Sequence, residues 1–404
     1  NQGFEVYLVE KDANLGGLTR RIHYSLDGTD VQAYLGDIID KVYQNPLIHV
    51  SIGSTIIETS GYVGNFITKV MSERGVEEIH HGITIIATGA EEHKPGEYLY
   101  GKDNRVLSLL ELEERIAKGD PGVLNTRSLV MIQCVGCRDE HRPYCSRVCC
   151  GQAIKCALKL KEVNPMMEVY ILYRDMMTYG FREDYYREAA NQDVKFIRYE
   201  SDDKPQVEVY EVNGRSALKV TVTDPILGKK LAVDTDVLAL AAASVPSATN
   251  GETSRIFKVP LSHDGFFLEA HVKLRPVDFA ADGIFLCGTA HYPKNISETI
   301  GQAYGAADRA ATILSQDALR ASGTVAEIDK EKCVGCGLCV QACNFGAVTY
   351  NEELGVSEIN PVLCKGCGNC AVVCLSGACQ IEGFRDEQVL SQIDAYIKPS
   401  RARS

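Results

Sequence analysis

The spacing of cysteines constrains this chain more than any other feature. Eight of its 16 cysteines form two copies of one run, with three cysteines at every third position and a fourth four residues later. Thiolates at this spacing surround an iron–sulfur cube, and the fourth cysteine of each run ligates the other cube. We therefore predict two [4Fe-4S] clusters. Their ligand sets are Cys333, Cys336, Cys339 and Cys374 for one, and Cys364, Cys367, Cys370 and Cys343 for the other.

Two structural zinc sites, each with four thiolates, are the alternative interpretation of this repeat. Zinc ribbons rarely use three cysteines at such close spacing, so we favour iron. Residues 327–384 resemble a bacterial-type two-cluster ferredoxin. Asn344 and Leu375 stand where a proline usually follows the fourth cysteine, a difference that removes no ligand. Cys379 lies outside the pattern, and we interpret it as a small buried residue.

Composition excludes several other classes. The 404 residues and 44.3 kDa are enough for two or three domains. A net charge of −12 opposes binding to a nucleic-acid backbone. No apolar stretch approaches the roughly 20 residues that span a bilayer, and no signal peptide precedes the thiols, so we expect a cytoplasmic protein. Clustered cysteines in a long chain of this kind favour metal ligation over a disulfide framework.

From residue 5 to about 315, short apolar runs alternate with helical stretches, which indicates an α/β fold. The pattern predicts buried strands at 5–9, 83–87, 128–133, 168–173, 237–241 and 284–287. It predicts helices at 31–43, 151–163, 296–319 and 386–397. Residues 206–233 are expected to form a small antiparallel unit with Asn213-Gly214 as its hairpin turn, and residues 320–326 a linker.

Three segments carry a dinucleotide-binding signature. A strand that ends at Glu10 leads into a Gly-Gly turn, and an acid in that place hydrogen-bonds an adenosine ribose. Residues 85–89 read Ile-Ile-Ala-Thr-Gly, and residues 283–289 read Gly-Ile-Phe-Leu-Cys-Gly-Thr before an alanine-rich helix. In this order, the segments resemble the thioredoxin-reductase-like flavoproteins. The resemblance implies FAD, bound by Glu10, Lys11, Gly16, Gly17, Thr88, Gly89, Gly288, Thr289, Lys294, Asn295 and Ile296.

Two departures accompany this resemblance. The family usually has an acid where this chain has Thr289, which affects hydrogen bonding to the ribityl chain. The first strand and its G-x-G-x-x-G motif belong just before residue 1, so we interpret the chain as a short or N-terminally truncated form. The helix that begins at Ile296 is expected to meet the electron-rich edge of the flavin.

A second dinucleotide unit should follow the strand at 128–133, but thiols stand where its glycine loop belongs. Only Gly136 remains there, so the backbone cannot approach a pyrophosphate closely, and we expect no hydride transfer from nicotinamide. We predict a third [4Fe-4S] cluster, held by Cys134, Cys145, Cys149 and Cys150. The alternatives are a zinc site and a redox-active disulfide, either Cys134–Cys137 or Cys149–Cys150.

Several motifs together resemble the A-type flavin subunits of heterodisulfide reductase: residues 61–66, 133–136, 138–140, 144–150 and 287–291. The resemblance implies the flavin hub of an electron-bifurcating or electron-confurcating complex, which couples disulfide reduction and ferredoxin to a hydrogenase or formate donor. Other subunits of that complex, a hydrogenase or formate dehydrogenase module, ferredoxin and a second copy of the chain are the implied partners. The resemblance also implies that Lys155 approaches the flavin N5, whereas its position on a helix alone indicates a solvated lysine. Cys137 stands where the family usually has serine.

The predicted architecture is a thioredoxin-reductase-like α/β fold with two dinucleotide domains and a C-terminal α+β ferredoxin domain. We assign residues 1–125 and 243–322 to the FAD-binding domain, 126–242 to a Rossmann-like domain with an iron–sulfur insertion, and 323–404 to the ferredoxin domain with a terminal helix. Three other functions are consistent with parts of the sequence. They are an NAD(P)H-dependent oxidoreductase like the small subunit of glutamate synthase, an electron-wire component of a quinone-interacting respiratory complex, and a zinc-bearing scaffold.

Overall fold

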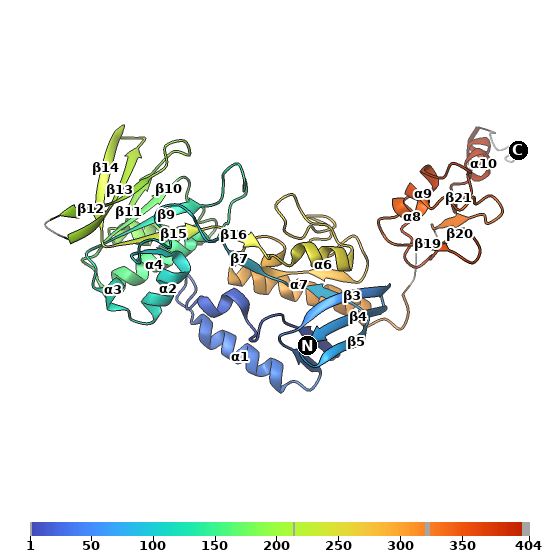
Figure 1. The fold of residues 1–404 in the computed structure, drawn as a ribbon, viewed down its shortest axis with the longest axis horizontal. Coiled ribbons are helices and arrows are strands. Elements are labelled where there is room, and N and C mark those ends of the chain that lie inside the picture. The colour runs from blue at the N-terminus through green and yellow to red at the C-terminus, as the bar shows by residue number, and fades with distance from the viewer. Residues whose placement is uncertain (1, 213–214, 320–323, 398–404) are drawn as a thin grey trace, which may run out of the picture.

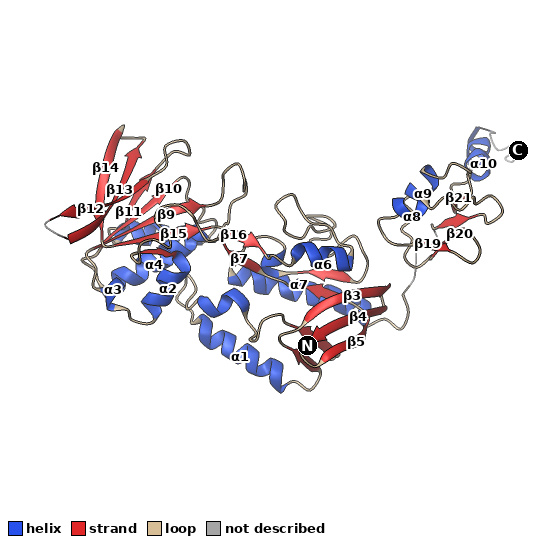
Figure 2. Cartoon of the chain, viewed as in Figure 1, coloured by secondary structure: helices blue, strands red, loops and turns tan. Residues whose placement is uncertain are grey.

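The computed structural model describes residues 2–212, 215–319 and 324–397. Three parts follow one another along the molecule, with the C-terminal part at one end (Figure 1). The first two parts contain both helices and strands (Figure 2), but the predicted alternation is interrupted by runs of consecutive strands over residues 48–108 and 195–246. The predicted turn at Asn213-Gly214 and residues 320–323 of the predicted linker lie outside the described residues. None of the described helices combines the length and apolar character needed to cross a membrane.

The central part is built on a parallel sheet with the strand order β11-β10-β9-β15-β8. Its strands are β8 (Val106–Ser108), β9 (Ser128–Val135), β10 (Glu168–Tyr173), β11 (Lys195–Arg198) and β15 (Val237–Ala242). Its helices are α2 (Leu109–Ala117), α3 (Pro121–Leu124), α4 (Cys149–Val163) and α5 (Arg182–Asn191). We predicted residues 106–124 in the FAD-binding domain. That boundary is wrong, because β8 pairs with β15 and α2 packs in the core of this sheet.

The two faces of the central sheet are covered differently. Side chains of a strand point alternately to opposite faces, and Leu129 and Met131 pack against α2 and α4. Val130 and Ile132 face the other way and pack against Leu218 on β13. That strand belongs to an antiparallel sheet of β12 (Gln206–Val212), β13 (Arg215–Asp224) and β14 (Lys229–Thr235). The predicted antiparallel unit at 206–233 is thereby confirmed.

The part predicted to bind FAD contains two parallel strand pairs, β1–β2 and β6–β17, which no described strand joins. An antiparallel pair, β7–β16, connects it to the central part, and β3, β4 and β5 form a further antiparallel sheet. The strands are β1 (Val6–Val9), β2 (Ile48–Ser51), β3 (Thr55–Tyr62), β4 (Asn65–Ser72), β5 (Gly75–His81), β6 (Thr84–Ile86), β7 (Ala90–Glu92), β16 (Ser244–Pro246) and β17 (Ile284–Leu286).

The helices of this part are α1 (Val31–Gln44), α6 (Asn250–Phe257) and α7 (Ile296–Leu314), with short 3₁₀ turns at Gly17–Arg21 and Gly288–Ala290. We predicted that the last helix continues to residue 319, but it ends at Leu314 with Ser315 as its C-cap. The alanine-rich pattern stops there, and the polar side chains of Ser315, Gln316 and Asp317 compete with the helix for backbone hydrogen bonds.

The C-terminal part repeats one small unit twice. β18 (Ala326–Ile328) pairs with β21 (Cys379–Ile381), and β19 (Val348–Asn351) pairs with β20 (Val356–Ile359). Two short helices, α8 (Leu338–Ala342) and α9 (Asn369–Val372), lie within the two cysteine runs. The predicted terminal helix is confirmed as α10 (Asp386–Ile397).

Candidate functional site

Each predicted ferredoxin cluster corresponds to one cavity in the C-terminal part. The first cavity is lined by Cys333, Cys336, Cys339 and Cys374. The second is lined by Cys343, Cys364, Cys367 and Cys370. The fourth cysteine of each run therefore lies in the cavity of the other run, which is the arrangement that the spacing predicts. The residues fit two cubes, and iron ligation itself stays a prediction.

Glycines let the cysteine runs turn tightly around these cavities. Gly335 and Gly366 both adopt left-handed backbone conformations, with φ of +69° and +61°. A Cβ at Gly335 would lie 2.5 Å from the carbonyl oxygen of Gly355, and a Cβ at Gly366 would lie 2.6 Å from that of Thr324. Because real Cβ atoms do not approach so closely, only glycine fits at these two positions.

Backbone N–H groups donate to three of the cysteine sulfurs that line the two cavities. The donor–acceptor pairs are Ala326 N to Cys364 Sγ at 3.2 Å, Ala347 N to Cys343 Sγ at 3.2 Å and Cys379 N to Cys374 Sγ at 3.3 Å. Burial opposes ionisation of Cys374, but hydrogen bonds from the Cys379 backbone and Ser376 outweigh it and hold the pKa of Cys374 below its usual value. These contacts favour the thiolate, which is the form that binds iron.

Cys379 is 3% exposed on β21, so the prediction that it is a small buried residue is confirmed. It lies beside the first cavity, and burial raises the pKa of its thiol. A thiol kept protonated in this way packs as a small apolar group.

The loop between β9 and α4, residues 134–150, gathers five thiols, and we call it the thiol loop. Cys137, Cys149 and Cys150 are at most 2% exposed, and Cys134 and Cys145 are partly exposed. The pKa of each of the five thiols is shifted in part by other thiols of the same loop. The structure thus brings the four predicted ligands of the third cluster together, with Cys137 beside them.

The pKa shifts of these thiols come in two opposed pairs. The hydrogen bond from Cys134 lowers the pKa of Cys137 to about 6 and raises the pKa of Cys134. At the first turn of α4, the bond between Cys149 and Cys150 raises the pKa of Cys149 and lowers that of Cys150. These pairs are also the two that the disulfide alternative names. Across residues 2–212, 215–319 and 324–397, no three His, Cys, Asp or Glu side chains surround the position of a single metal ion.

The thiol loop is held in an unusual backbone conformation. Cys134, Arg138 and Arg147 all have positive φ, near +60°, which non-glycine residues adopt rarely and mostly at functional sites. Gly136 has a φ of +77°, and a Cβ there would lie 2.4 Å from the ring of His93. The chain therefore wraps around its own thiols where a dinucleotide-binding domain has a phosphate loop.

A guanidinium and a backbone N–H group lie beside two of these thiols. Arg138 places Nη1 3.8 Å from Cys134 Sγ and pairs with Asp175 at 2.6 Å. The backbone N–H of Arg147 donates to Cys145 Sγ at 3.3 Å. Positive charge and N–H donors near sulfur stabilise thiolates and anionic clusters.

Two of the predicted FAD segments meet at the ends of β6 and β17. A Cβ at Gly89 would lie 3.9 Å from Thr289 Oγ1, so the ends of the two strands face each other. Lys294 is 5% exposed, its ammonium donates to the carbonyl of Gly288, and burial lowers its pKa to about 8. Asn295 caps α7 by accepting from the N–H of Glu298 at 3.0 Å.

Four further predicted FAD residues, Glu10, Lys11, Gly16 and Gly17, lie in the segment that follows β1. Glu10 follows β1 and accepts from the backbone N–H of Asp12 at 2.9 Å. The ammonium of Lys11 lies 3.8 Å from Glu91 Oε1. Gly16 and Gly17, with φ of +113° and +47°, form the turn that follows. Glu10 thus follows the end of a parallel strand, as the resemblance implies, and ribose binding stays a prediction.

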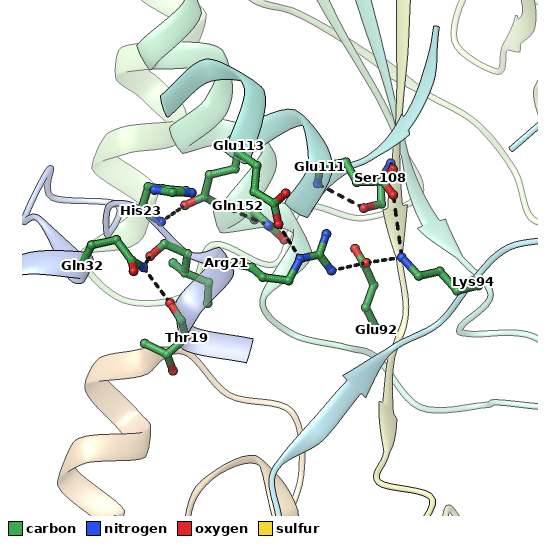
Figure 3. A network of polar contacts seen from close by, with 12 residues as sticks. Thr19, Arg21, His23, Gln32, Glu92, Lys94, Ser108, Glu111, Glu113 and Gln152 are labelled. Atoms are coloured by element: carbon green, nitrogen blue, oxygen red, sulfur yellow. Dashed lines mark hydrogen bonds and ion pairs between the residues drawn. The ribbon is translucent and has the colours of Figure 1, made fainter. Parts of the chain in front are cut away.

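Lys155 is buried rather than solvated, so the solvated alternative is wrong. Its ammonium is 2.8 Å from Glu113 Oε1 and donates to the carbonyl of Tyr24 at 2.6 Å. Glu113 is fully buried on α2 and also accepts from the N–H of His23 at 2.8 Å and from Gln152 at 3.3 Å (Figure 3). Approach of Lys155 to a flavin stays a prediction.

Sequence reasoning missed Glu113. A signal for it exists, because Glu113 stands four residues after Leu109 on the apolar face of α2, where an acid requires a buried partner. Figure 3 also shows a neighbouring set of contacts around Arg21, which pairs with Glu92 at 2.9 Å and, at 2.5 Å, with Glu114 on α2. The segment after Gly16-Gly17 is thereby tied to the central domain.

A stack of cations and rings joins the thiol loop to the segment 287–296. The guanidinium of Arg147 lies 4.9 Å from the ring centre of Tyr292 and 5.5 Å from that of Tyr179. The ammonium of Lys294 lies 3.9 Å from the centre of the same Tyr292 ring. Tyr179 in turn donates to Glu298 in the first turn of α7. The thiols and the start of α7 are therefore neighbours.

Comparison with known proteins agrees with this architecture. Residues 332–378 match the family described as 4Fe-4S dicluster domain. The chain is 39% identical, over 99% of its length, to the A-type component of the Methanococcus maripaludis H(2)/formate:CoB-CoM heterodisulfide,ferredoxin reductase, and covers 75% of it. It is 39% identical, over 78% of its length, to the A-type iron-sulfur component of the Methanocaldococcus jannaschii CoB--CoM heterodisulfide reductase, and covers 50% of that protein.

A Methanosarcina acetivorans relative, the A-type component of a ferredoxin:CoB-CoM heterodisulfide reductase, is 34% identical over 80% of the chain, which covers 44% of it. Among solved structures, T. acidophilum thioredoxin reductase matches with a TM-score of 0.51 at 16% identity, covering 78% of this chain and 92% of that one. Lactococcus lactis thioredoxin reductase matches with a TM-score of 0.50 at 16% identity, covering 77% and 99%. At this identity the two structures establish a thioredoxin-reductase-like fold and nothing further.

Proposed function

The chain belongs to the family of A-type heterodisulfide reductase subunits, and on that premise we propose that it is an FAD- and [4Fe-4S]-containing electron-transfer component of a flavin-based bifurcating or confurcating complex. In this proposal it works with other heterodisulfide-reductase-type subunits, ferredoxin, a hydrogenase or formate dehydrogenase module and a second copy of itself. The name of the M. maripaludis relative supports the ferredoxin, heterodisulfide and H2-or-formate parts of this set, and the second copy is a proposal without that support.

The observation that carries the proposal is the position of the thiol loop. Five thiols stand at the end of β9, where a reductase of this fold has its nicotinamide phosphate loop, and Arg147 joins them to Tyr292 beside the predicted flavin segment. A cluster held by Cys134, Cys145, Cys149 and Cys150 would then lie next to the flavin. This arrangement suits passage of electrons between a flavin and clusters, and it leaves no glycine loop for NAD(P)H.

When bound, FAD exchanges electrons in pairs, and iron–sulfur clusters pass them one at a time. The residues of this chain hold and orient these groups. Gly89 and Gly288, both with positive φ, let the backbone approach a ligand at the ends of β6 and β17. The N-terminus of α7 and the ammonium of Lys294 place positive charge at the same end, which favours an electron-rich ring edge.

The contact between the ferredoxin part and the flavin part supports one order of electron carriers. Lys365, in the loop of the second cavity, pairs with Asp282, which precedes β17. A Cβ at Gly346, which follows Cys343, would lie 2.7 Å from the ammonium of Lys258. Both contacts involve loops that carry ligands of the second predicted cluster. We place that cluster toward the flavin part and the first one toward an external partner.

The choice of electron donor tests the proposal. The complex, purified without oxygen, is mixed separately with reduced ferredoxin and with NADH or NADPH while the flavin absorbance is followed. We expect reduced ferredoxin to bleach the flavin and both nicotinamides to leave it oxidised. Rapid bleaching by a nicotinamide would overturn the proposal in favour of a self-sufficient NAD(P)H oxidoreductase. Co-purification with a quinone-reactive membrane protein in place of the proposed partners would favour the electron-wire alternative.

A further inference from the structure

Gln133 carries a fully buried amide without a partner in the described part of the chain. It stands directly before Cys134 in β9 with 0% exposure, and neither its Nε2 nor its Oε1 has a hydrogen bond. Its backbone carbonyl is satisfied separately, by the hydroxyl of Tyr199 at 2.7 Å. Buried polar groups in native proteins are nearly always paired, with protein, water or a bound group. An amide that is unpaired at both ends therefore points to a ligand.

The strand pleat fixes the direction of this side chain. Leu129 and Met131 lie in the core shared with α2 and α4, whereas Val130 and Ile132 lie in the core on the opposite face. Gln133 is the next residue of the first set, and the first residue of the strand with positive φ, Cys134, comes after it. Its amide is therefore directed to the face on which α4 packs.

Helix α4 begins on that face, with Cys149 and Cys150 in its first turn. It runs for 15 residues, and its N-cap residue, Val148, has no side chain that can accept from the first N–H groups. Cys149 belongs to the same core cluster as Met131. The end of β9 and the start of α4 therefore present an amide donor, unpaired backbone N–H groups and the positive end of a helix to the thiols.

We propose that the Gln133 Nε2 donates a hydrogen bond to a sulfur of the third cluster, and that Gln133 is a positioning residue that sets the reduction potential of this cluster. The inference rests on the proposed function, which supplies the cluster. Hydrogen bonds to cluster sulfurs are one of the main determinants of potential. Reduction adds negative charge, so a donor stabilises the reduced state and raises the potential.

The test compares Gln133→Met with wild type in the full complex. Methionine has nearly the length of glutamine but no donor, so it fills the same space. Met131→Leu, an apolar exchange on the same face, is the matched control for packing. Iron and FAD contents are measured first, and each cluster is then titrated by EPR at controlled potential. The signal of the third cluster is assigned as the one lost in Cys134→Ser.

We expect Gln133→Met to retain wild-type iron and FAD and to make the third cluster about tenfold harder to reduce, a shift of about 59 mV to lower potential for one electron. The two ferredoxin clusters and the Met131→Leu control should keep their wild-type potentials. A third cluster that is present at full occupancy with an unchanged potential overturns this inference alone. Loss of iron from Gln133→Met with normal folding also overturns it, since it assigns Gln133 to assembly. Wild-type protein without a third cluster overturns both this inference and the proposed cluster.

Discussion

The guanidinium of Arg147 lies 4.9 Å from the ring centre of Tyr292, and this contact joins the thiol loop to the start of α7. Arg147 also donates its backbone N–H to Cys145, so one residue touches a predicted cluster ligand and the flavin segment. Burial opposes the charge on Arg147, but its hydrogen bond to Tyr292 raises the pKa of the guanidinium, which stays charged. The electron path that we propose depends on this close contact between two domains.

A double-mutant cycle measures this contact. Arg147→Met and Tyr292→Leu, alone and together, should show a coupling free energy of about 0.5–2 kcal/mol, the range of cation–π pairs from exposed to desolvated sites. The free energy of unfolding is measured by urea denaturation. Arg147→Met combined with Tyr210→Leu on β12 is the control, and its coupling should stay within about 0.5 kcal/mol of zero. Equal coupling in both cycles would contradict the specific contact.

The buried pair of Lys155 and Glu113 predicts a large loss of stability when one partner is neutralised. Glu113→Gln leaves an ammonium uncompensated in a buried site, which should cost about 3–5 kcal/mol of unfolding free energy. Lys159→Met on the same helix removes an exposed pair with Glu162 and should cost less than about 1 kcal/mol. Denaturation of the three proteins side by side provides the comparison. Similar losses in both variants would show that the 113–155 pair is not buried in solution.

The sorting of cysteines between the two ferredoxin cavities predicts which of two nearby thiols is a ligand. Cys343→Ser should remove the second cluster, about four irons per chain, although Cys343 belongs to the first run. Cys379→Ser should leave the iron content unchanged, because Cys379 is outside the pattern. Iron and sulfide analysis with EPR distinguishes the two variants. Loss of the first cluster, rather than the second, from Cys343→Ser would contradict the crossed ligation.

Lys294 predicts a dependence of stability on pH. Burial lowers its pKa from 10.5 to about 8, so between these values the unfolded chain holds a proton that the folded chain has released. Stability from this group must therefore rise as the pH increases from about 8 to about 10.5, and it is least below pH 8. The unfolding free energies of wild type and Lys294→Met are measured at pH 7 and pH 9.5. The value for wild type minus the value for the variant should be larger at pH 9.5. An unchanged difference would contradict a buried, weakly basic Lys294.

Local sequence signals predicted the elements whose determinants lie within a few residues of one another. Strand β9 was expected at 128–133 and spans Ser128–Val135, and the ligand sorting followed from the spacing of the cysteines alone. The ends of elements were predicted less accurately, since α7 ends at Leu314 and not at residue 319. The antiparallel sheet β3-β4-β5 was not predicted, because its exposed strands alternate weakly between polar and apolar residues.

Features set by tertiary packing could not be predicted in the same way. Glu113 and Lys155 are 42 residues apart, and their ion pair exists only because α2 and α4 cover the same face of the central sheet. The contact of Arg147 with Tyr292 joins residues from two domains, and no periodicity in either segment encodes it. The assignment of residues 106–124 failed for the same reason, since β8 enters the central sheet beside β15, far along the chain.

The content of iron, sulfide, zinc and flavin in the complex purified without oxygen tests the central claim most directly, with EPR of the reduced sample. We expect about twelve irons per chain, four for each of three cubes, and one FAD. Cys134→Ser should lower the iron count by about four. About eight irons, unchanged in Cys134→Ser, would leave the ferredoxin clusters in place and make the thiol loop a dithiol site. Zinc in place of iron would contradict electron transfer through this chain.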